Sequence, residues 1–194
     1  MEKKLAVVGI ILASVLLASC ASIDDATPVP PGAFRLVSPG RADNAVLERK
    51  HAGNLKTNPN CIGDNVSPSL QWFNAPEKTR SFAIVMDDQA GRAGLGVSHW
   101  VAYGIPASVT SLAEGEASVA SPKFTGGTNT LKQTLYFGPC TPKGNAPQHY
   151  VLTLIATDLE PGALKAGLTR PELFEQLKGH NLRAASLVLR FVNP

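Results

Sequence analysis

Four short runs of almost unbroken apolar residues constrain the fold of this 194-residue chain more than any other feature. They span residues 81–87, 100–105, 150–157 and 185–192, and glycine, proline or polar residues separate them. Runs of this length are typical of interior strands covered on both faces. Their irregular spacing, without intervening helical patterns, favours an antiparallel sheet. The sequence therefore predicts a mainly β domain.

One helix and two weaker strands complete the predicted elements. The helix covers residues 169–179, because Thr169 and Glu172 have the spacing of a capping box and Gly179 provides an end. Shorter strand patterns lie at residues 33–38 and 69–73. These elements predict a single domain over residues 33–194.

The N-terminus has the proportions of a signal peptide. A basic start is followed by an apolar run over residues 5–17, which is too short to cross a membrane comfortably. Small residues before Cys20 match a bacterial lipobox, so residues 1–19 are expected to be cleaved and Cys20 to be lipidated. Residues 20–32 are proline-rich and predict a flexible tether. The alternative is an ordinary secretory signal with a chance cysteine; the lipoprotein reading places the domain in the bacterial envelope, facing the periplasm.

Two further cysteines, Cys61 and Cys140, are the remaining pair in the exported chain. Oxidising compartments favour a disulfide between them, which would close a loop of roughly 80 residues and contribute roughly 4 kcal/mol. The alternative is two separate buried thiols.

Charge and histidine spacing exclude several classes of function. The formal net charge of +3 is too small and too dispersed for a dedicated nucleic-acid binder. The four histidines have no zinc-site spacing with the cysteines, so we expect no metal and no cofactor. His51 lies among charged and polar residues and is expected to be a solvated loop histidine.

An acidic residue and a histidine flank a glycine-rich loop between two of the predicted strands. Asp88 ends the run at 81–87, and His99 opens the next run. A carboxylate ending one strand and an imidazole opening the next can meet at one edge of a sheet. We expect the carboxylate to hold the ring in one tautomer and to favour its charged form, which can donate to an anion.

Three motifs resemble the phosphatidylethanolamine-binding family, the Raf-kinase-inhibitor-like proteins, in its bacterial branch. They are the Asp88 to Trp100 segment, the pattern C-x-G-x-N-x-S-P-x-L-x-W from Cys61, and the loop GPCTPKG at 138–144 with the following Gln-His-Tyr. The resemblance covers most of the chain, roughly from residue 34 to 192. It implies a central antiparallel sheet, a second smaller sheet and short C-terminal helices.

The resemblance also implies a small pocket for phosphate, a phosphoryl headgroup or a carboxylate. Two titratable groups of the family pattern are absent, because Ala90 replaces a second acid and a glutamine replaces a second histidine. The expected ligand-binding residues are Asp88, His99, Pro139, Gln148 and Tyr150.

These observations together predict a lipid-anchored anion-binding module that is not an enzyme. Such a module could inhibit or regulate an envelope enzyme, so an envelope protein is the expected partner. The alternative is a hydrolase of phosphoryl or acyl esters, in which His99 acts as a general base oriented by Asp88. Ser98 cannot serve as its nucleophile, because adjacent side chains in a strand diverge.

Overall fold

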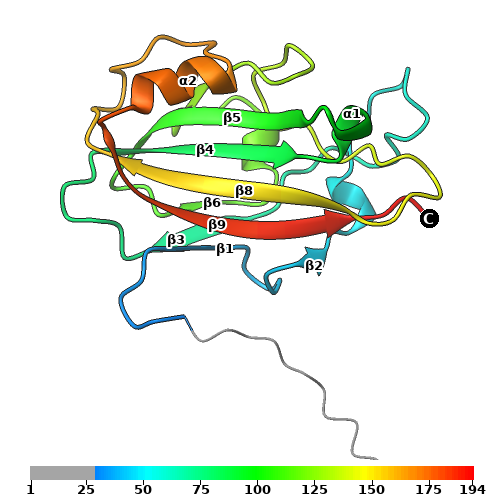
Figure 1. Cartoon of the computed structure of the whole chain (residues 1–194), viewed down its shortest axis with the longest axis horizontal. Helices are drawn as coiled ribbons and strands as arrows, with labels where there is room; N and C mark the ends of the chain where they lie inside the picture. Colours follow the sequence, from blue (N-terminus) through cyan, green and yellow to red (C-terminus); the bar gives the residue numbers. More distant parts are fainter. Residues whose placement is uncertain (1–28) are drawn as a thin grey trace, which may run out of the picture. The chain divides into compact units, whose positions relative to one another are not determined.

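The computed structural model describes residues 29–194, and in this part of the chain the strands form two sheets (Figure 1). The larger sheet has six strands in the order β2-β9-β8-β4-β5-β7, and the smaller has three in the order β1-β3-β6. Every pairing is antiparallel except that of β2 with β9. The predicted antiparallel sheet with a second smaller sheet is confirmed. The predicted signal peptide and the lipidation site Cys20 lie outside the described residues.

The bounds of the elements follow the predicted runs closely. The strands are β1 (Arg35–Val37), β2 (Ala45–Val46), β3 (Leu70–Phe73), β4 (Ser81–Asp88), β5 (Val97–Pro106), β6 (Ser111–Leu112), β7 (Thr125–Gly126), β8 (Gln148–Thr157) and β9 (Asn181–Phe191). The helical elements are η1 (Arg49–His51), α1 (Gly91–Gly94), η2 (Glu116–Ser118) and α2 (Arg170–Leu177). None of these helices is long and apolar enough to cross a membrane.

Strand β4 is the centre of the fold because both of its faces are covered. All eight of its residues are buried. On one face its side chains pack with β5, β8 and the small sheet, in a cluster that includes Trp72, Phe82 and Trp100. On the other face they pack beneath α2, through Leu173 and Leu177. This double cover explains the unbroken apolar run at 81–87.

The outer strands of the large sheet differ from the prediction. Strands β8 and β9 alternate between buried and more exposed residues, so they are not covered on both faces as we expected. The reason is that the cluster beneath α2 takes its buried strand residues from β4 and β5, and reaches β8 through the half-buried Ile155. The C-terminal region holds a single helix, α2, instead of several, and the chain ends with β9. The capping box of Thr169 and Glu172 is present as predicted.

A bulge in β5 changes the direction of one side chain. Met86 pairs with Trp100 and Asp87 with Ser98, so His99 has no partner residue on β4. In a regular strand, His99 and Trp100 would face opposite sides of the sheet. A bulged residue is released from this alternation. His99 therefore shares a face with Trp100 and packs edge-on against Tyr150, at 5.1 Å between ring centroids.

The motif beginning at Cys61 fastens the loop that precedes β8. The predicted disulfide between Cys61 and Cys140 is present, across 79 residues of sequence. The side chain of Asn65 donates to the carbonyl of Tyr136 at 3.0 Å and accepts from the amide of Gly138 at 2.8 Å. Because its side chain is used in this way, Asn65 has a structural role in the loop.

His51 is fully buried, so its expected place in a solvated loop is wrong. Its Nδ1 donates to the carbonyl of Val66 at 2.7 Å, and its Nε2 accepts from the guanidinium of Arg41 at 2.7 Å. Burial lowers the pKa of His51, which agrees with this neutral, bridging form. The charged neighbours that suggested solvent exposure instead cover the ring.

We expect the disulfide to contribute substantially to stability. The double variant Cys61→Ser/Cys140→Ser should lose about 4 kcal/mol of the free energy of unfolding, since the closed loop limits the unfolded chain. Urea denaturation of the oxidised protein and the double variant measures the difference. Each single variant should lose the same free energy of unfolding as the double variant. A loss below about 1 kcal/mol in the double variant would contradict the prediction.

Candidate functional site

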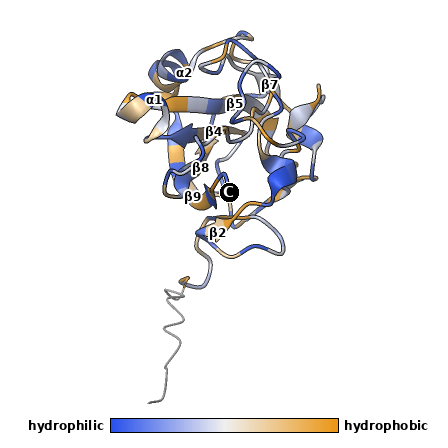
Figure 2. Cartoon of the chain, turned by 90° about the vertical axis from the view of Figure 1, so that its right-hand side faces the viewer, coloured by the Kyte–Doolittle hydropathy of each residue, from blue (hydrophilic) through white to orange (hydrophobic). Residues whose placement is uncertain are grey.

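The end of β4 and the starts of β5 and β8 meet beside α1 at one end of the large sheet (Figure 1). Figure 2 views the molecule from this end. A cavity of about 430 Å³ lies here. Its lining residues are Leu55, Asn58, Asn60, Asp88, Ala90, Gly91, Arg92, Ala93, Val97, His99, Thr130, Leu131, Phe137, Cys140, Pro142, Asn145, Gln148 and Tyr150.

The structure brings four of the five predicted ligand-binding residues to this cavity. Asp88, His99, Gln148 and Tyr150 line it, and we call these four the polar cluster. Pro139 does not line it: this residue is buried, and its carbonyl accepts a hydrogen bond from the amide of Gly53 at 2.8 Å. Its neighbours Cys140 and Pro142 face the cavity in its place.

His99 is held by a backbone carbonyl and not by Asp88, contrary to our expectation. Its Nδ1 lies 2.8 Å from the carbonyl oxygen of Phe137, which can only accept, so the neutral ring carries its proton on Nδ1. Among residues 29–194 no carboxylate pairs with this ring. Burial lowers the pKa of His99 to about 4. The ring is therefore neutral near pH 7 and offers Nε2 as an acceptor.

Asp88 is tied to the loop that follows it. Its Oδ1 accepts from the amide of Ala90 at 2.9 Å, and the residue is 2% exposed. Burial raises the pKa of Asp88, while the amides of Ala90 and Gly91 and the charge of His149 act in the opposite direction. The carboxyl group is thus placed where gaining a proton costs less than it would in water.

Tyr150 and Gln148 supply neutral hydrogen-bonding groups from β8. The hydroxyl of Tyr150 lies 2.9 Å from Oγ1 of Thr141 and donates to Oε1 of Gln148 at 3.3 Å. Burial raises the pKa of Tyr150, so the hydroxyl keeps its proton. Oε1 of Gln148 thus accepts from Tyr150, and no group within residues 29–194 accepts from its amide N–H groups, which are available to a ligand.

The cavity is larger and less charged than the single-anion pocket we expected. Asp88 and Arg92 are the only charged residues in its lining, and apolar side chains such as Val97, Leu131 and Phe137 line much of the rest. Its volume lies within the range of small-molecule sites. Among residues 29–194 there is no cluster of histidine, cysteine and acidic residues suited to a metal ion.

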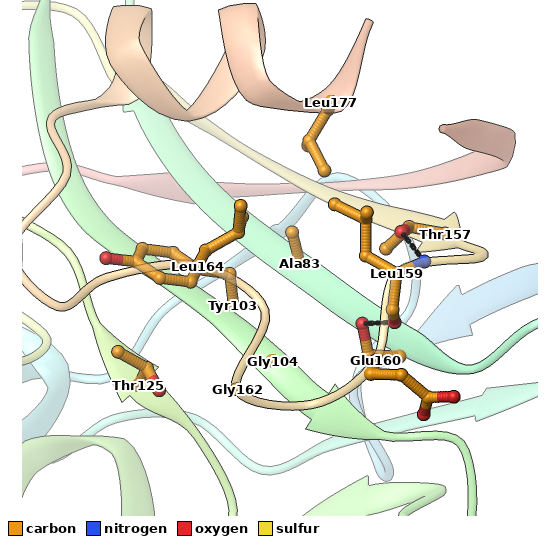
Figure 3. Close-up of a pocket in the computed structure, with 11 residues that line it drawn as sticks. Ala83, Tyr103, Gly104, Thr125, Thr157, Leu159, Glu160, Gly162, Leu164 and Leu177 are labelled. Carbon is orange, nitrogen blue, oxygen red and sulfur yellow. Dashed lines mark hydrogen bonds between the residues drawn. The ribbon is translucent and has the colours of Figure 1, made fainter. Parts of the chain in front are cut away.

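A second crevice, between α2 and the opposite face of the sheet, is too small to be a site. Figure 3 shows it beside Ala83 and Tyr103, with Leu177 of α2 on the other side. Its volume is about 10 Å³, which is barely room for one water molecule.

Two functional groups escaped the sequence reasoning. Thr141 is fully buried and bonds Tyr150, and the carbonyl of Phe137 sets the tautomer of His99. The loop at 138–144 indicated the region of Thr141, although nothing singled out its hydroxyl. A backbone carbonyl carries no sequence signal, so the role of Phe137 could not have been found.

Two relatives are similar to this chain in sequence, and a solved structure is similar to it in fold. A UPF0098 protein of Aquifex aeolicus is 31% identical over 80% of this chain and 92% of its own length. A Mycobacterium tuberculosis protein provisionally named the lipoprotein LppC is 34% identical over 73% of this chain and 67% of its own. The crystal structure of Escherichia coli YbcL, described as a member of the mammalian PEBP family, superposes with a TM-score of 0.73 at 26% identity, covering 83% of this chain and 99% of YbcL.

Comparison with a model of a whole protein family gives a match over most of the domain. The model of the phosphatidylethanolamine-binding protein family matches residues 38–192. This range includes both sheets from β2 onward and every residue of the polar cluster. The chain therefore belongs to the phosphatidylethanolamine-binding protein family.

Proposed function

We propose that this domain is a lipid-anchored module that binds a small ligand through an anionic group, such as a phosphate, a phosphoryl headgroup or a carboxylate. The observation that carries the proposal is the polar cluster, which places an acceptor and several neutral donors at one cavity. Neutral groups of both kinds suit a partly protonated anion better than a fully charged one.

A phosphoryl group that carries one proton meets each member of the polar cluster with a matching partner. Its unprotonated oxygens accept from the amide N–H groups of Gln148 and from the hydroxyl of Tyr150, which turns its single proton from Oε1 of Gln148 to the ligand. Its P–OH donates to Nε2 of His99, which is an acceptor in the neutral ring. A protonated Asp88 supplies a further donor, and burial raises its pKa in that direction.

The sequence and one relative support a place in the bacterial envelope. Cys20 follows a signal-like segment, and the relative LppC is named as a lipoprotein. The disulfide between Cys61 and Cys140 is consistent with an oxidising compartment. We propose that the lipid on Cys20 holds the domain at the membrane, facing the periplasm, where binding regulates or inhibits an envelope enzyme.

We propose binding rather than hydrolysis because Asp88, the predicted orienting group, does not bond His99; the Phe137 carbonyl holds Nδ1 instead. A neutral ring held in this way keeps the lone pair that a general base needs, so turnover is the measurement that separates the two functions. Turnover of phosphoryl or acyl esters by the wild type that is abolished in His99→Ala would replace the binding module with the hydrolase.

Removing one hydroxyl from the polar cluster should weaken phosphate binding. Tyr150→Phe keeps the ring against His99 and removes the donor, so the Kd for inorganic phosphate should rise about fivefold to tenfold. NMR titration of the full chain in detergent micelles measures it.

Tyr103→Phe is the matched control for this change. Tyr103 is an equally buried tyrosine whose hydroxyl donates to the Lys165 carbonyl on the opposite side of the sheet. Its loss should leave phosphate binding unchanged. An equal effect of both variants, or no saturable binding to the wild type, would refute the proposed site.

Phosphate should bind more tightly than sulfate, although the two anions have the same shape. Sulfate carries no proton between pH 5 and 8, so it offers nothing to Nε2 of His99. We expect a preference of about tenfold at pH 6 that shrinks towards pH 8, as phosphate loses its second proton. Calorimetric titrations at both pH values test this, and equal affinities for the two anions would contradict the neutral state of His99.

The neutral His99 should also make the fold sensitive to acid. Its folded-state pKa of about 4 lies below the unfolded value of about 6.5, so the unfolded chain takes up the proton first. The stabilisation present above pH 6.5 is lost as the pH falls to 4, and amounts to about 3 kcal/mol. His99→Gln should flatten the pH dependence of the free energy of unfolding by that amount.

The exposed His180 provides the control for this measurement. It pairs with Asp158 at the surface, where an ion pair is worth at most about 1 kcal/mol, so His180→Gln should change the free energy of unfolding by no more than that at any pH between 4 and 7. Identical slopes for wild type and His99→Gln would show that His99 is not buried in its neutral form.

A further inference from the structure

The turn α1 at the edge of the cavity has an unusual backbone. Arg92 (φ 52°, ψ 41°) and Ala93 (φ 58°, ψ 41°) both adopt the left-handed conformation, and Gly94 follows at φ 91°. Side chains other than glycine, asparagine and aspartate rarely adopt it, because Cβ approaches the next carbonyl oxygen. Two such residues in succession form a strained segment, and strain of this kind is concentrated at functional sites.

The polar cluster and the start of β5 hold this turn in place. The amide of Ala90 donates to Oδ1 of Asp88 at 2.9 Å, and the amide of Gly96 donates to the carbonyl of Gly91 at 2.9 Å. A Cβ added to Gly91 would lie 2.6 Å from Cγ2 of Val97 and 3.2 Å from Oδ2 of Asp88. The turn thus lies directly on the Asp88 carboxyl group.

Arg92 is the cation that this strained backbone brings to the cavity. The residue is exposed and belongs to the lining, and among residues 29–194 it forms no ion pair with a carboxylate. A guanidinium group presents planar donors that match a carboxylate or a phosphoryl group at two points. The other charged residue of the lining, Asp88, already accepts from the turn itself.

We propose that Arg92 determines the specificity of the cavity by pairing with the anionic group of the ligand, and that the strained turn holds it there. This inference rests on the proposed anion-binding function and adds a charged donor to the neutral polar cluster. Apolar residues Leu55, Val97, Leu131 and Phe137 also line the cavity. The ligand class is therefore a phosphomonoester or carboxylate that carries a small apolar or aromatic substituent.

Phenyl phosphate and phenol separate the contribution of charge from that of the apolar walls. Wild type should prefer phenyl phosphate, and Arg92→Gln should raise its Kd about tenfold. Arg92→Lys should recover part of the loss, because lysine keeps the charge without the paired donors. Binding of phenol should be the same in all three proteins. Titrations use the full chain in detergent micelles at low and at moderate salt.

Two further variants make the test specific to this turn. Arg183→Gln removes an exposed arginine of β9 that is outside the cavity lining, and should leave both Kd values unchanged. Ala93→Gly relieves the left-handed strain, so it should raise Tm by about 2 °C and weaken phenyl phosphate binding, since Arg92 is held less firmly.

The outcomes distinguish this inference from the proposed function. If Tyr150→Phe weakens binding while Arg92→Gln binds phenyl phosphate like the wild type, anion binding stands and the role of Arg92 is overturned. If the wild type binds neither phenyl phosphate nor inorganic phosphate, both are overturned. An equal loss in Arg183→Gln and Arg92→Gln would assign the effect to net charge and overturn the specific role of Arg92.

Discussion

The hydrogen bond from His99 to the carbonyl of Phe137 is the interaction on which the chemistry of the cavity depends. It fixes the tautomer of the ring and so decides that Nε2 is an acceptor. Two distant segments fix the position of this carbonyl. The amide of Phe137 donates to the His99 carbonyl, and the side chain of Asn65 bonds both residues that flank Phe137. Movement of this loop would therefore change the protonation of the ring as well as the shape of the cavity.

The resulting site is unusual for the anion-binding role that we propose, because its most buried members are neutral or acidic. A buried neutral imidazole and a buried carboxyl group disfavour a fully charged guest unless a proton enters with it. The cation lies at the exposed turn. In the function that we propose, the polar cluster recognises the ligand by its hydrogen-bond pattern, whereas Arg92 recognises its charge.

Periodicity and capping chemistry predicted the main antiparallel strands and α2, and the family resemblance implied the second sheet. The apolar run at 81–87 and the capping box at Thr169 are local sequence patterns, and each forms the element that it predicts. The burial of His51 and the neutral state of His99 could not be predicted, since both depend on which distant segments cover the ring. Likewise, nothing in the sequence marked the bulge that turns His99 toward Tyr150, because a bulge is a property of two paired strands.

The order of the strands in the large sheet has a consequence for the assembly of the cavity. Strand β8 lies between β4 and β9, although it follows Cys140 in the chain. Both cysteines precede β8 in the chain. The disulfide can therefore form while the edge of β4 that pairs with β8 is still open. Strands β8 and β9, which are joined through α2, then add to this edge and bring Gln148 and Tyr150 to the cavity. The cavity lining, which includes Gln148 and Tyr150, is therefore complete only after the segment that follows Cys140 has joined the sheet.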